Sequence, residues 1–236
     1  MKILAVESSA LAAGAALWED GRLLGEFFLN VGLTHSATLM PMIESLLRYA
    51  DVSVRDVDLF AVANGPGSFT GVRIGVATVK GLAQPLCKPC AGISTLYAMA
   101  HNMLGTDALI CCVMDARCRQ VYTALFESRD GRIVRLSDDG AMSLDDLLSR
   151  LRAYERRIVF VGDGAQLCYT AFRGELPNVE LAPAAQRFQR ASSVAQAAFA
   201  SGAETIGVPA DELSVSYLRL SQAERERKQK LEAQTS

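Results

Sequence analysis

The spacing of apolar residues predicts a series of strands and helices along the chain. Short apolar runs bounded by turn residues such as Glu19-Asp20-Gly21 are typical of strands, whereas apolar residues three and four positions apart are typical of helices. The predicted strands of the first part are 2–7, 13–18, 22–29, 58–63 and 90–93. The predicted helices are 35–49, which Thr34 or Ser36 would cap, then 72–84 and 95–104.

A second series follows in the same order, about a hundred residues later. Its predicted strands are 108–114, 120–127, 132–136 and 157–161, and its predicted helices are 143–154 and 165–172. The order strand-strand-strand-helix-strand-helix therefore occurs twice, although no residue identity links the two halves. Two such units side by side are the architecture of the actin-like ATPases and the sugar kinases. Beyond them, 191–200 is predicted to be a helix and 212–220 an extended segment.

These patterns predict an α/β protein with the actin-like ATPase (ribonuclease H-like) fold, built from two βββαβα halves. We expect an N-terminal subdomain over 1–104, a C-terminal subdomain over 105–220 and a charged tail over 221–236. The tail mixes both signs of charge, which favours a solvated end over a segment that contacts RNA or another protein.

Composition and charge narrow the classes of function. Half of the 236 residues are apolar and the formal net charge is -2, so the chain lacks the basic character of a dedicated nucleic-acid-binding protein. No apolar run is long enough to span a bilayer, and the first residues lack the features of a signal peptide. We therefore expect a cytoplasmic protein without membrane contact.

Six cysteines are consistent with a reducing compartment. Cys87 and Cys90 form a Cys-x-x-Cys pair, a spacing found in zinc sites and in redox-active pairs. A zinc site needs a second pair at a recognisable spacing, which the other four cysteines do not provide. A redox pair would open a helix, whereas Pro89 leads toward a predicted strand. The two cysteines are therefore interpreted as small buried apolar side chains.

The glycine-rich stretch 65–75 lies between a predicted strand and a predicted helix, where loops often hold a phosphate. A P-loop would need a Gly-Lys pair, and the nearest cation here is Arg73. A dinucleotide-binding fingerprint would need glycine in place of Thr70. A nucleophile elbow around Ser68 would need glycines in place of Pro66 and Thr70. None of these three phosphate or nucleophile motifs fits.

Acidic residues at two strand ends leave two interpretations open. Asp115 follows a strand at the place where actin-like enzymes carry a catalytic carboxylate, and Glu7 ends the first strand. The alternative is that Asp115 pairs with Arg117 or Arg119 and holds the turn, and that Glu7 only ends its strand. An actin-like ATPase also needs two phosphate-binding turns. Residues 8–13 and 115–119 contain no glycine, so the backbone there cannot approach a phosphate closely. The nucleotide site is therefore predicted to be degenerate.

The chain has only two histidines, His35 and His101, which lie far apart in the sequence. They make a poor metal site, and no local signature supports a Ser-His-Asp site. His35 is expected to face solvent at the start of its helix.

Two helices could provide a surface for another chain. Small residues four apart in the helix after the glycine loop would permit close helix approach, and the preceding helix is rich in Leu and Met. The alternative is that both apolar faces cover this chain's own sheet. The residues predicted for the contact are Leu39, Met42, Ile43, Leu46, Gly71, Ile74, Gly75 and Thr78.

Five segments carry a resemblance to a known family. They are Ile3 to Ser9, Gly65 to Gly75, Gly92 to Leu96, Asp115-Ala116-Arg117 with Val121-Tyr122, and Tyr217-Leu218-Arg219. In this order, across almost the whole chain, the sequence resembles the TsaB (YeaZ) family of bacterial tRNA threonylcarbamoyladenosine biosynthesis proteins. Glu7 departs from the family pattern, which usually has aspartate there. Residues 128–210 carry little likeness.

The resemblance implies an actin-like fold and a role without catalytic or metal-binding residues. Family members bind the related catalytic subunit TsaD, and the ATPase TsaE joins them to modify the adenosine next to the tRNA anticodon. TsaD carries metal-binding histidines, and this chain has no pair of histidines four apart. The resemblance thus implies a scaffold that holds no cofactor alone and contacts tRNA indirectly, with ATP or ADP at the complex left open.

The interface implied by the resemblance uses helices 36–49 and 71–84, either in a homodimer or with TsaD. The opposing hypothesis is an enzyme. It would be a residual nucleotide hydrolase or a glycoprotease-like hydrolase that uses Asp115 and Glu7.

Overall fold

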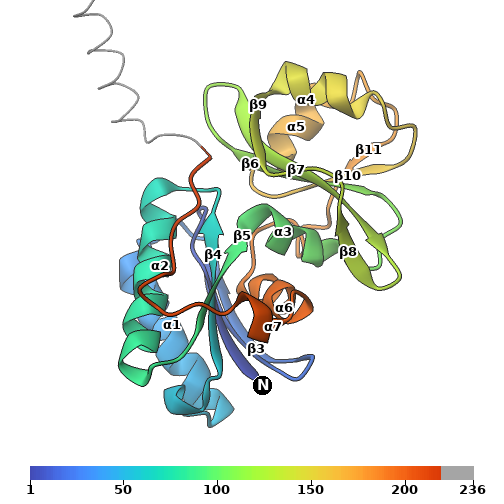
Figure 1. Ribbon diagram of the computed structural model, residues 1–236. Coiled ribbons are helices and arrows are strands. Elements are labelled where there is room, and N and C mark those ends of the chain that lie inside the picture. The colour runs from blue at the N-terminus through green and yellow to red at the C-terminus, as the bar shows by residue number, and fades with distance from the viewer. Residues whose placement is uncertain (219–236) are drawn as a thin grey trace, which may run out of the picture.

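The computed structural model describes residues 1–218, which form two lobes, each around a mixed β-sheet (Figure 1). In the N-terminal lobe the strand order is β3-β2-β1-β4-β5, with β1 antiparallel to β2 and parallel to β4. The bounds are β1 (Lys2–Glu7), β2 (Ala13–Glu19), β3 (Arg22–Leu29), β4 (Leu59–Gly65) and β5 (Cys90–Ser94). All five strands lie within a residue or two of their predicted positions.

The C-terminal lobe repeats this order. Its sheet runs β11-β10-β6-β7-β8, and β9 pairs with β7 off this path. The bounds are β6 (Leu109–Asp115), β7 (Gln120–Arg129), β8 (Arg132–Arg135), β9 (Gly140–Ser143), β10 (Ile158–Val161) and β11 (Val179–Leu181). With β9 left out of the count, both sheets have the order third, second, first, fourth, fifth, which confirms the predicted duplication. The sequence did not reveal β9 and β11, because they are short and lack an apolar run.

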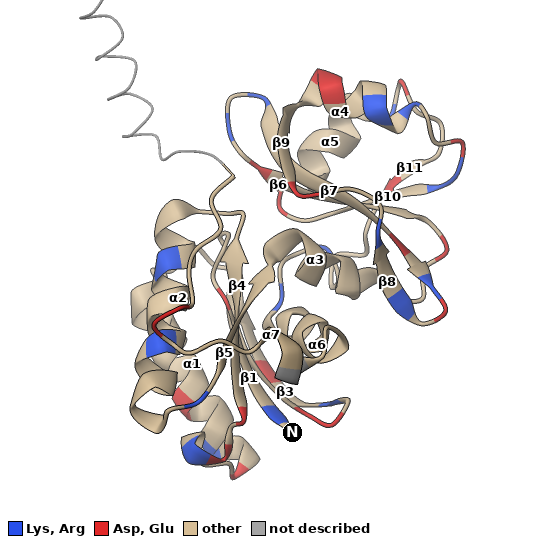
Figure 2. Ribbon diagram, in the orientation of Figure 1, with Lys and Arg blue, Asp and Glu red and all other residues tan. Residues whose placement is uncertain are grey.

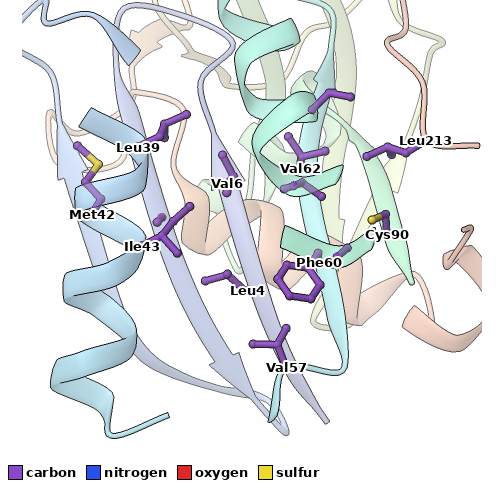
Figure 3. Packing of buried hydrophobic residues seen from close by; sticks show 14 of the residues in the cluster. Leu4, Val6, Leu39, Met42, Ile43, Val57, Phe60, Val62, Cys90 and Leu213 are labelled. Carbon is purple, nitrogen blue, oxygen red and sulfur yellow. The ribbon is translucent and has the colours of Figure 1, made fainter. Parts of the chain in front are cut away.

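Helices α1 (His35–Ala50) and α2 (Phe69–Ala83) cover one face of the N-terminal sheet. Leu39 and Ile43 of α1 lie over Leu4 and Val6 of β1 (Figure 3). Thr34 precedes α1 but makes no side-chain cap, so the predicted cap is absent. The second helix begins three residues earlier than predicted because the Ser68 hydroxyl accepts the backbone N–H of Gly71 and caps it.

The remaining helices divide between the lobes (Figure 1). In the C-terminal lobe, Ser143 caps α4 as predicted, and its hydroxyl accepts the backbone N–H of Asp146. That helix ends at Leu151, and α3 ends at Ala100 before a 3-10 turn, so both are shorter than expected. The bounds are α3 (Thr95–Ala100), α4 (Leu144–Leu151), α5 (Ala165–Phe172), α6 (Ala191–Ala200) and α7 (Ala203–Ile206).

The chain returns to the N-terminal lobe after the C-terminal sheet is complete, so α6 packs outside the lobe to which the expected subdomain 105–220 assigned it. Val194 and Ala198 of α6 are buried in one cluster with Ile3 and Ala5 of β1, where the small residues of α6 allow close packing. In the first turn of α6, Ser192 N–H donates to the Glu26 carboxylate of β3. The second unit therefore ends near residue 190, and the expected tail 221–236 lies outside the described residues.

Residues 208–218 then run along α2 on the other side of the sheet (Figure 1). Val208 pairs with Cys90 of β5, and Lys80 of α2 donates to the carbonyl oxygens of Asp211 and Leu213. In the segment 212–220 that was expected to be extended, residues 213–217 have no helix or turn, Glu212 lies in a turn and Leu218 lies at a bend.

None of the described helices combines the length and the apolar character needed to cross a membrane. Positive and negative residues are interspersed over both lobes (Figure 2).

Candidate functional site

The glycine-rich loop packs directly on the turn between β1 and β2. Ser68 N–H donates to the Ser9 carbonyl oxygen (2.6 Å), and the Ser8 hydroxyl donates to the Gly71 carbonyl oxygen (2.9 Å). A Cβ atom on Gly67 or Gly71 would lie less than 3.0 Å from a backbone carbonyl oxygen of that turn. The glycines therefore serve close packing within this chain, and the loop fills space beside the turn that would hold a phosphate.

Two further glycines are required by the same packing. A Cβ on Gly75 would lie less than 3.0 Å from the Ser8 hydroxyl, and one on Gly65 would meet the Ser216 carbonyl oxygen. Gly65 also has a φ of 127°, which favours glycine. The hypothesis that this stretch provides a close approach for another chain is therefore corrected, because the neighbour is the chain itself.

Six of the eight residues predicted for partner contact are buried within this chain. Four belong to the core under α1 and are at most 5% exposed, and two are the packed glycines of α2. They are Leu39, Met42, Ile43, Leu46, Gly71 and Gly75. Only Ile74 and Thr78 are partly exposed. An amphipathic pattern shows which face is covered, but it does not distinguish the chain's own sheet from a partner.

The side of α1 and α2 that does not pack on the sheet is exposed, and we call it the α1–α2 face. Most of its members are small or apolar, and its charged side chains are Glu44, Arg48 and Arg73. The small or apolar members are Ala37, Met40, Pro41, Thr70, Ile74, Ala77, Thr78 and Gly81. Gly81 is notable because a Cβ there would meet nothing within 4 Å, although glycine inside a helix costs about 1 kcal/mol relative to alanine. Nothing in the described chain explains a glycine there.

A cleft of about 780 Å³ lies between the lobes. Its N-terminal wall includes Ser9 and Ser68, its C-terminal wall includes Asp115 and Asp163, and Tyr217 lies at its edge. This volume falls in the range of small-molecule sites. The cleft occupies the position expected for a nucleotide in an actin-like ATPase, but one of its two phosphate turns is covered by the glycine-rich loop.

Asp115 holds the turn that follows β6. Its carboxylate accepts the backbone N–H of Arg117 (2.7 Å), and within residues 1–218 it forms no ion pair with Arg117 or Arg119. The turn-holding role is confirmed, although the partner is the backbone and not a guanidinium. Arg117, Cys118 and Arg119 have φ angles of 62°, 52° and 55°, a conformation that disfavours L side chains. The turn at 115–119, which corresponds to the second phosphate-binding turn of an actin-like ATPase, therefore adopts this conformation without glycine.

Glu7 is buried beneath the cleft and does not line it. One carboxylate oxygen accepts Ser9 N–H (2.6 Å), and the other has no partner among the described residues. Burial raises the pKa of Glu7 to about 7, with a further contribution from the Asp163 carboxylate. Burial likewise raises the pKa of Asp163, whose carboxylate accepts the amide of Gln189 (2.7 Å).

The described residues contain no group of three or more His, Cys, Asp and Glu side chains that could hold a metal ion. Glu7 and Asp115 differ in exposure. Glu7 is buried, whereas Asp115 is exposed and accepts a hydrogen bond from its own turn. Of these two carboxylates, a substrate in the cleft would touch only Asp115.

Both histidines pack against other residues of this chain. His35 does not face solvent as expected, because its Nε2 lies 2.7 Å from the Ala10 carbonyl oxygen and its ring lies beside Gly71. His101 is buried against the Tyr97 ring, with centroids 4.9 Å apart, and burial lowers its pKa to about 4. Neither ring nitrogen of His101 has a hydrogen-bond partner in the described part of the chain.

The cysteine pair is divided between surface and core. Cys90 is buried, as interpreted from the sequence, whereas Cys87 is exposed, so that interpretation is wrong for Cys87. Cys118 is the second exposed thiol, and all six cysteines are free.

These exposures predict a simple thiol titration. In the native state we expect Cys87 and Cys118 to react with a thiol reagent such as DTNB within minutes, and the buried four to react only on unfolding. Burial raises the pKa of Cys111 to about 12, which further suppresses its thiolate. The check is the native thiol count in the wild type and in Cys87→Ser and Cys118→Ser, each of which should lose one rapid thiol. Rapid reaction of a third thiol in the wild type would contradict the structure.

Comparison with known proteins gives consistent results at the sequence level. Residues 30–232 match the family model described as TsaD: tRNA N6-adenosine threonylcarbamoyltransferase. The chain is 34% identical over 225 residues to the tRNA threonylcarbamoyladenosine biosynthesis protein TsaB of Bacillus subtilis, covering 95% of this chain and 96% of that protein. It is 32% identical over 169 residues to the Escherichia coli protein of the same name, covering 70% and 73%.

Solved structures agree with the fold. YeaZ from Pseudomonas aeruginosa superposes with a TM-score of 0.77 at 26% sequence identity, covering 92% of this chain and 99% of that one. The predicted α/β actin-like fold with two βββαβα halves is therefore confirmed.

Proposed function

Since this chain belongs to the TsaB (YeaZ) family of tRNA threonylcarbamoyladenosine biosynthesis proteins, we propose that it acts as a non-catalytic scaffold for the threonylcarbamoyl-transferring subunit TsaD. In this proposal the chain works in the cytoplasm, TsaE joins the assembly, and tRNA is contacted through TsaD. It binds no cofactor alone.

The observation that carries the proposal is the packing of the glycine-rich loop on the turn at Ser8 and Ser9. In a phosphate-binding protein the backbone amides of such a loop are free to bind the phosphate. Here the loop packs on the turn, and Ser68 N–H already donates to the Ser9 carbonyl oxygen. The carboxylates support the same conclusion, because Glu7 is enclosed and Asp115 accepts a bond from its own turn.

A hydrolase is the opposing hypothesis, and it predicts a different result. A residual nucleotide or peptide hydrolase would need Asp115 as its accessible carboxylate. Steady hydrolysis of ATP or peptide by the purified chain, lost in Asp115→Ala, would overturn the non-catalytic assignment.

The α1–α2 face is proposed as the surface that binds TsaD, and it is equally available for a homodimer of this chain. TsaD is related to this chain through the family model, so each partner can supply two helices to one bundle. The small side chains at Ala77 and Gly81, four residues apart, allow a facing helix to approach closely.

Placing a charge on this face tests the proposal. Ala77→Arg is expected to weaken binding of purified TsaD from the same organism at least tenfold, because the guanidinium would be buried without a partner. Isothermal titration calorimetry measures the affinity, and sedimentation measures any homodimer. Ala171→Arg, at an exposed alanine of α5 in the other lobe, is the matched control and should bind as the wild type does. Equal affinity for the Ala77 variant and the wild type would contradict the proposal.

A further inference from the structure

The turn between β6 and β7 contains residues that its backbone conformation disfavours. Arg117, Cys118 and Arg119 all have φ angles between 52° and 62°, so three consecutive L residues adopt the left-handed conformation. Glycine would adopt this conformation without the steric cost of a Cβ atom. Backbone strain of this kind persists only where the surrounding structure holds it, and it is concentrated at functional sites.

Two other hairpins of the chain have residues suited to the same conformation. The β2–β3 hairpin places Asp20 and Gly21 at its left-handed positions, and the β7–β8 hairpin places Asp130 and Gly131 there. Aspartate and glycine are the residues that tolerate these positions well. The β6–β7 turn keeps arginine instead, which indicates that the side chains are required there and that the turn geometry alone does not determine the residues.

Hydrogen bonds hold the β6–β7 turn in its strained conformation. Arg117 N–H donates to the Asp115 carboxylate (2.7 Å), and Gln120 N–H donates to the Arg117 carbonyl oxygen (3.0 Å). The Arg119 carbonyl oxygen accepts the N–H of Leu144, the first residue of α4 (3.2 Å). The two guanidinium groups are therefore carried on a well-held backbone.

Both arginines of the turn are exposed and have no ionic partner in residues 1–218. Asp115 lies at the base of the turn, but its carboxylate accepts the Arg117 N–H and forms no ion pair with either guanidinium. The turn projects from the C-terminal lobe and carries positive residues (Figure 2). Guanidinium groups held in this way are suited to bind phosphate groups, with which they form paired hydrogen bonds.

An exposed aromatic ring lies at the edge of the same cleft, on the N-terminal lobe. Tyr217 is 46% exposed and stacks on Phe69 with ring centroids 5.1 Å apart, and its hydroxyl accepts the Nε–H of Arg73 (2.6 Å). Tyr217, Phe69 and Arg117 all line this cleft. Phe69 covers one side of the Tyr217 ring, and the exposed part is available to a flat group. Unpaired RNA bases stack on aromatic side chains of this kind.

We propose that this edge of the cleft contacts RNA directly, with Arg117 and Arg119 on backbone phosphates and the Tyr217 ring on an unpaired base. An acidic protein surface would satisfy the guanidinium groups but would leave the ring without a stacking partner, so the two features together favour RNA. In the proposed function tRNA is contacted through TsaD, and the present inference adds a contact made by this chain itself. The glycine-rich loop takes no part in it.

Labelled tRNA titrated at several salt concentrations tests this contact. Arg117→Gly and Arg119→Gly are each expected to weaken tRNA binding at least about fivefold, and to reduce by about one the slope of log affinity against log salt concentration, because each removes one phosphate contact. The melting temperature of each variant should rise by about 2 °C, because glycine relieves the left-handed conformation. A loss of binding is then not a loss of folding.

Two further substitutions complete the test. Tyr217→Leu is expected to weaken tRNA binding at least about fivefold without changing the salt slope, whereas Tyr217→Phe keeps the ring and should bind as the wild type does. Arg132→Ala is the matched control for charge, at an exposed arginine of the β7–β8 hairpin without an ion pair among the described residues. Its tRNA affinity should change less than about twofold, and its salt slope should not change.

Measuring the chain alone and its complex with TsaD separates this inference from the proposed function. If the two glycine variants bind tRNA as the wild type does in both forms, or if neither form binds tRNA, the direct contact is overturned, while the scaffold proposal stands as long as TsaD binds. If the glycine variants lose affinity for TsaD and not for tRNA, the turn contacts protein and the assignment to RNA is overturned. A loss of tRNA affinity with the expected change in slope and with unchanged TsaD binding supports the direct contact.

Discussion

Gly71→Ala is expected to destabilise the chain by about 3 kcal/mol or more, the upper range for overpacking. The added Cβ would overlap the Ser8 carbonyl oxygen, and a backbone oxygen cannot move aside as a flexible side chain can. Relief would separate the loop from the β1–β2 turn and would break the hydrogen bond from the Ser8 hydroxyl to the Gly71 carbonyl oxygen. For a chain of this size the melting temperature should fall by roughly 6–12 °C, measured by circular dichroism.

Gly81→Ala provides the matched control ten residues further along the same helix. Its Cβ would meet nothing within 4 Å, so only the helix propensity changes, and the variant should be more stable by up to about 1 kcal/mol. A Gly71→Ala variant as stable as the wild type would contradict the packing of the glycine-rich loop.

Glu7→Gln is expected to reveal a pH dependence that the wild type conceals. Glu7 has its pKa raised from 4.5 to about 7, so the folded state holds its proton more tightly than the unfolded state does. Its contribution to stability is therefore present below pH 4.5 and is lost as the pH rises to 7. His101 has its pKa lowered from 6.5 to about 4, so its contribution is present above pH 6.5 and is lost as the pH falls to 4.

These two dependences have opposite signs over pH 4.5 to 6.5, and each amounts to about 3 kcal/mol over its full range. In the wild type they oppose one another. Glu7→Gln should lose stability steeply as the pH falls from 6.5 to 4.5, whereas His101→Phe should gain stability over the same interval. Urea unfolding at half-unit pH steps measures both slopes. Parallel pH profiles for the two variants would show that the buried groups do not titrate in this way.

Much of the fold could be predicted from local patterns. Strands such as 13–18 and 22–29 are mostly apolar segments separated by the clear turn Glu19-Asp20-Gly21, and the repeated order of elements identified the two halves. The return of α6 to the first lobe could not be predicted, because it depends on contacts between Val194 and strand residues nearly two hundred positions earlier.

The candidate site could be predicted mainly by exclusion. Comparing the glycine-rich loop with known motifs excluded a P-loop, a dinucleotide-binding fingerprint and a nucleophile elbow, but it left the role of Gly71 and Gly75 open. Their neighbour is Ser8, more than sixty residues away, and local sequence does not report such a contact. The same limit applies to Leu39 and Ile43, whose periodicity indicates burial without identifying what buries them. Which apolar side chains remain exposed could be learned only from the structure.

The return of residues 191–218 to the N-terminal lobe has a consequence for the order of folding during synthesis. Domains usually fold as units from the N-terminus as the chain emerges from the ribosome. Here the C-terminal sheet is complete once residue 181 has been made, while the first lobe still lacks α6 and the segment that pairs with Cys90. The lobe translated second is therefore the first to possess its whole sequence. The core of the lobe translated first is complete only after α6 and residues 208–215 have been made.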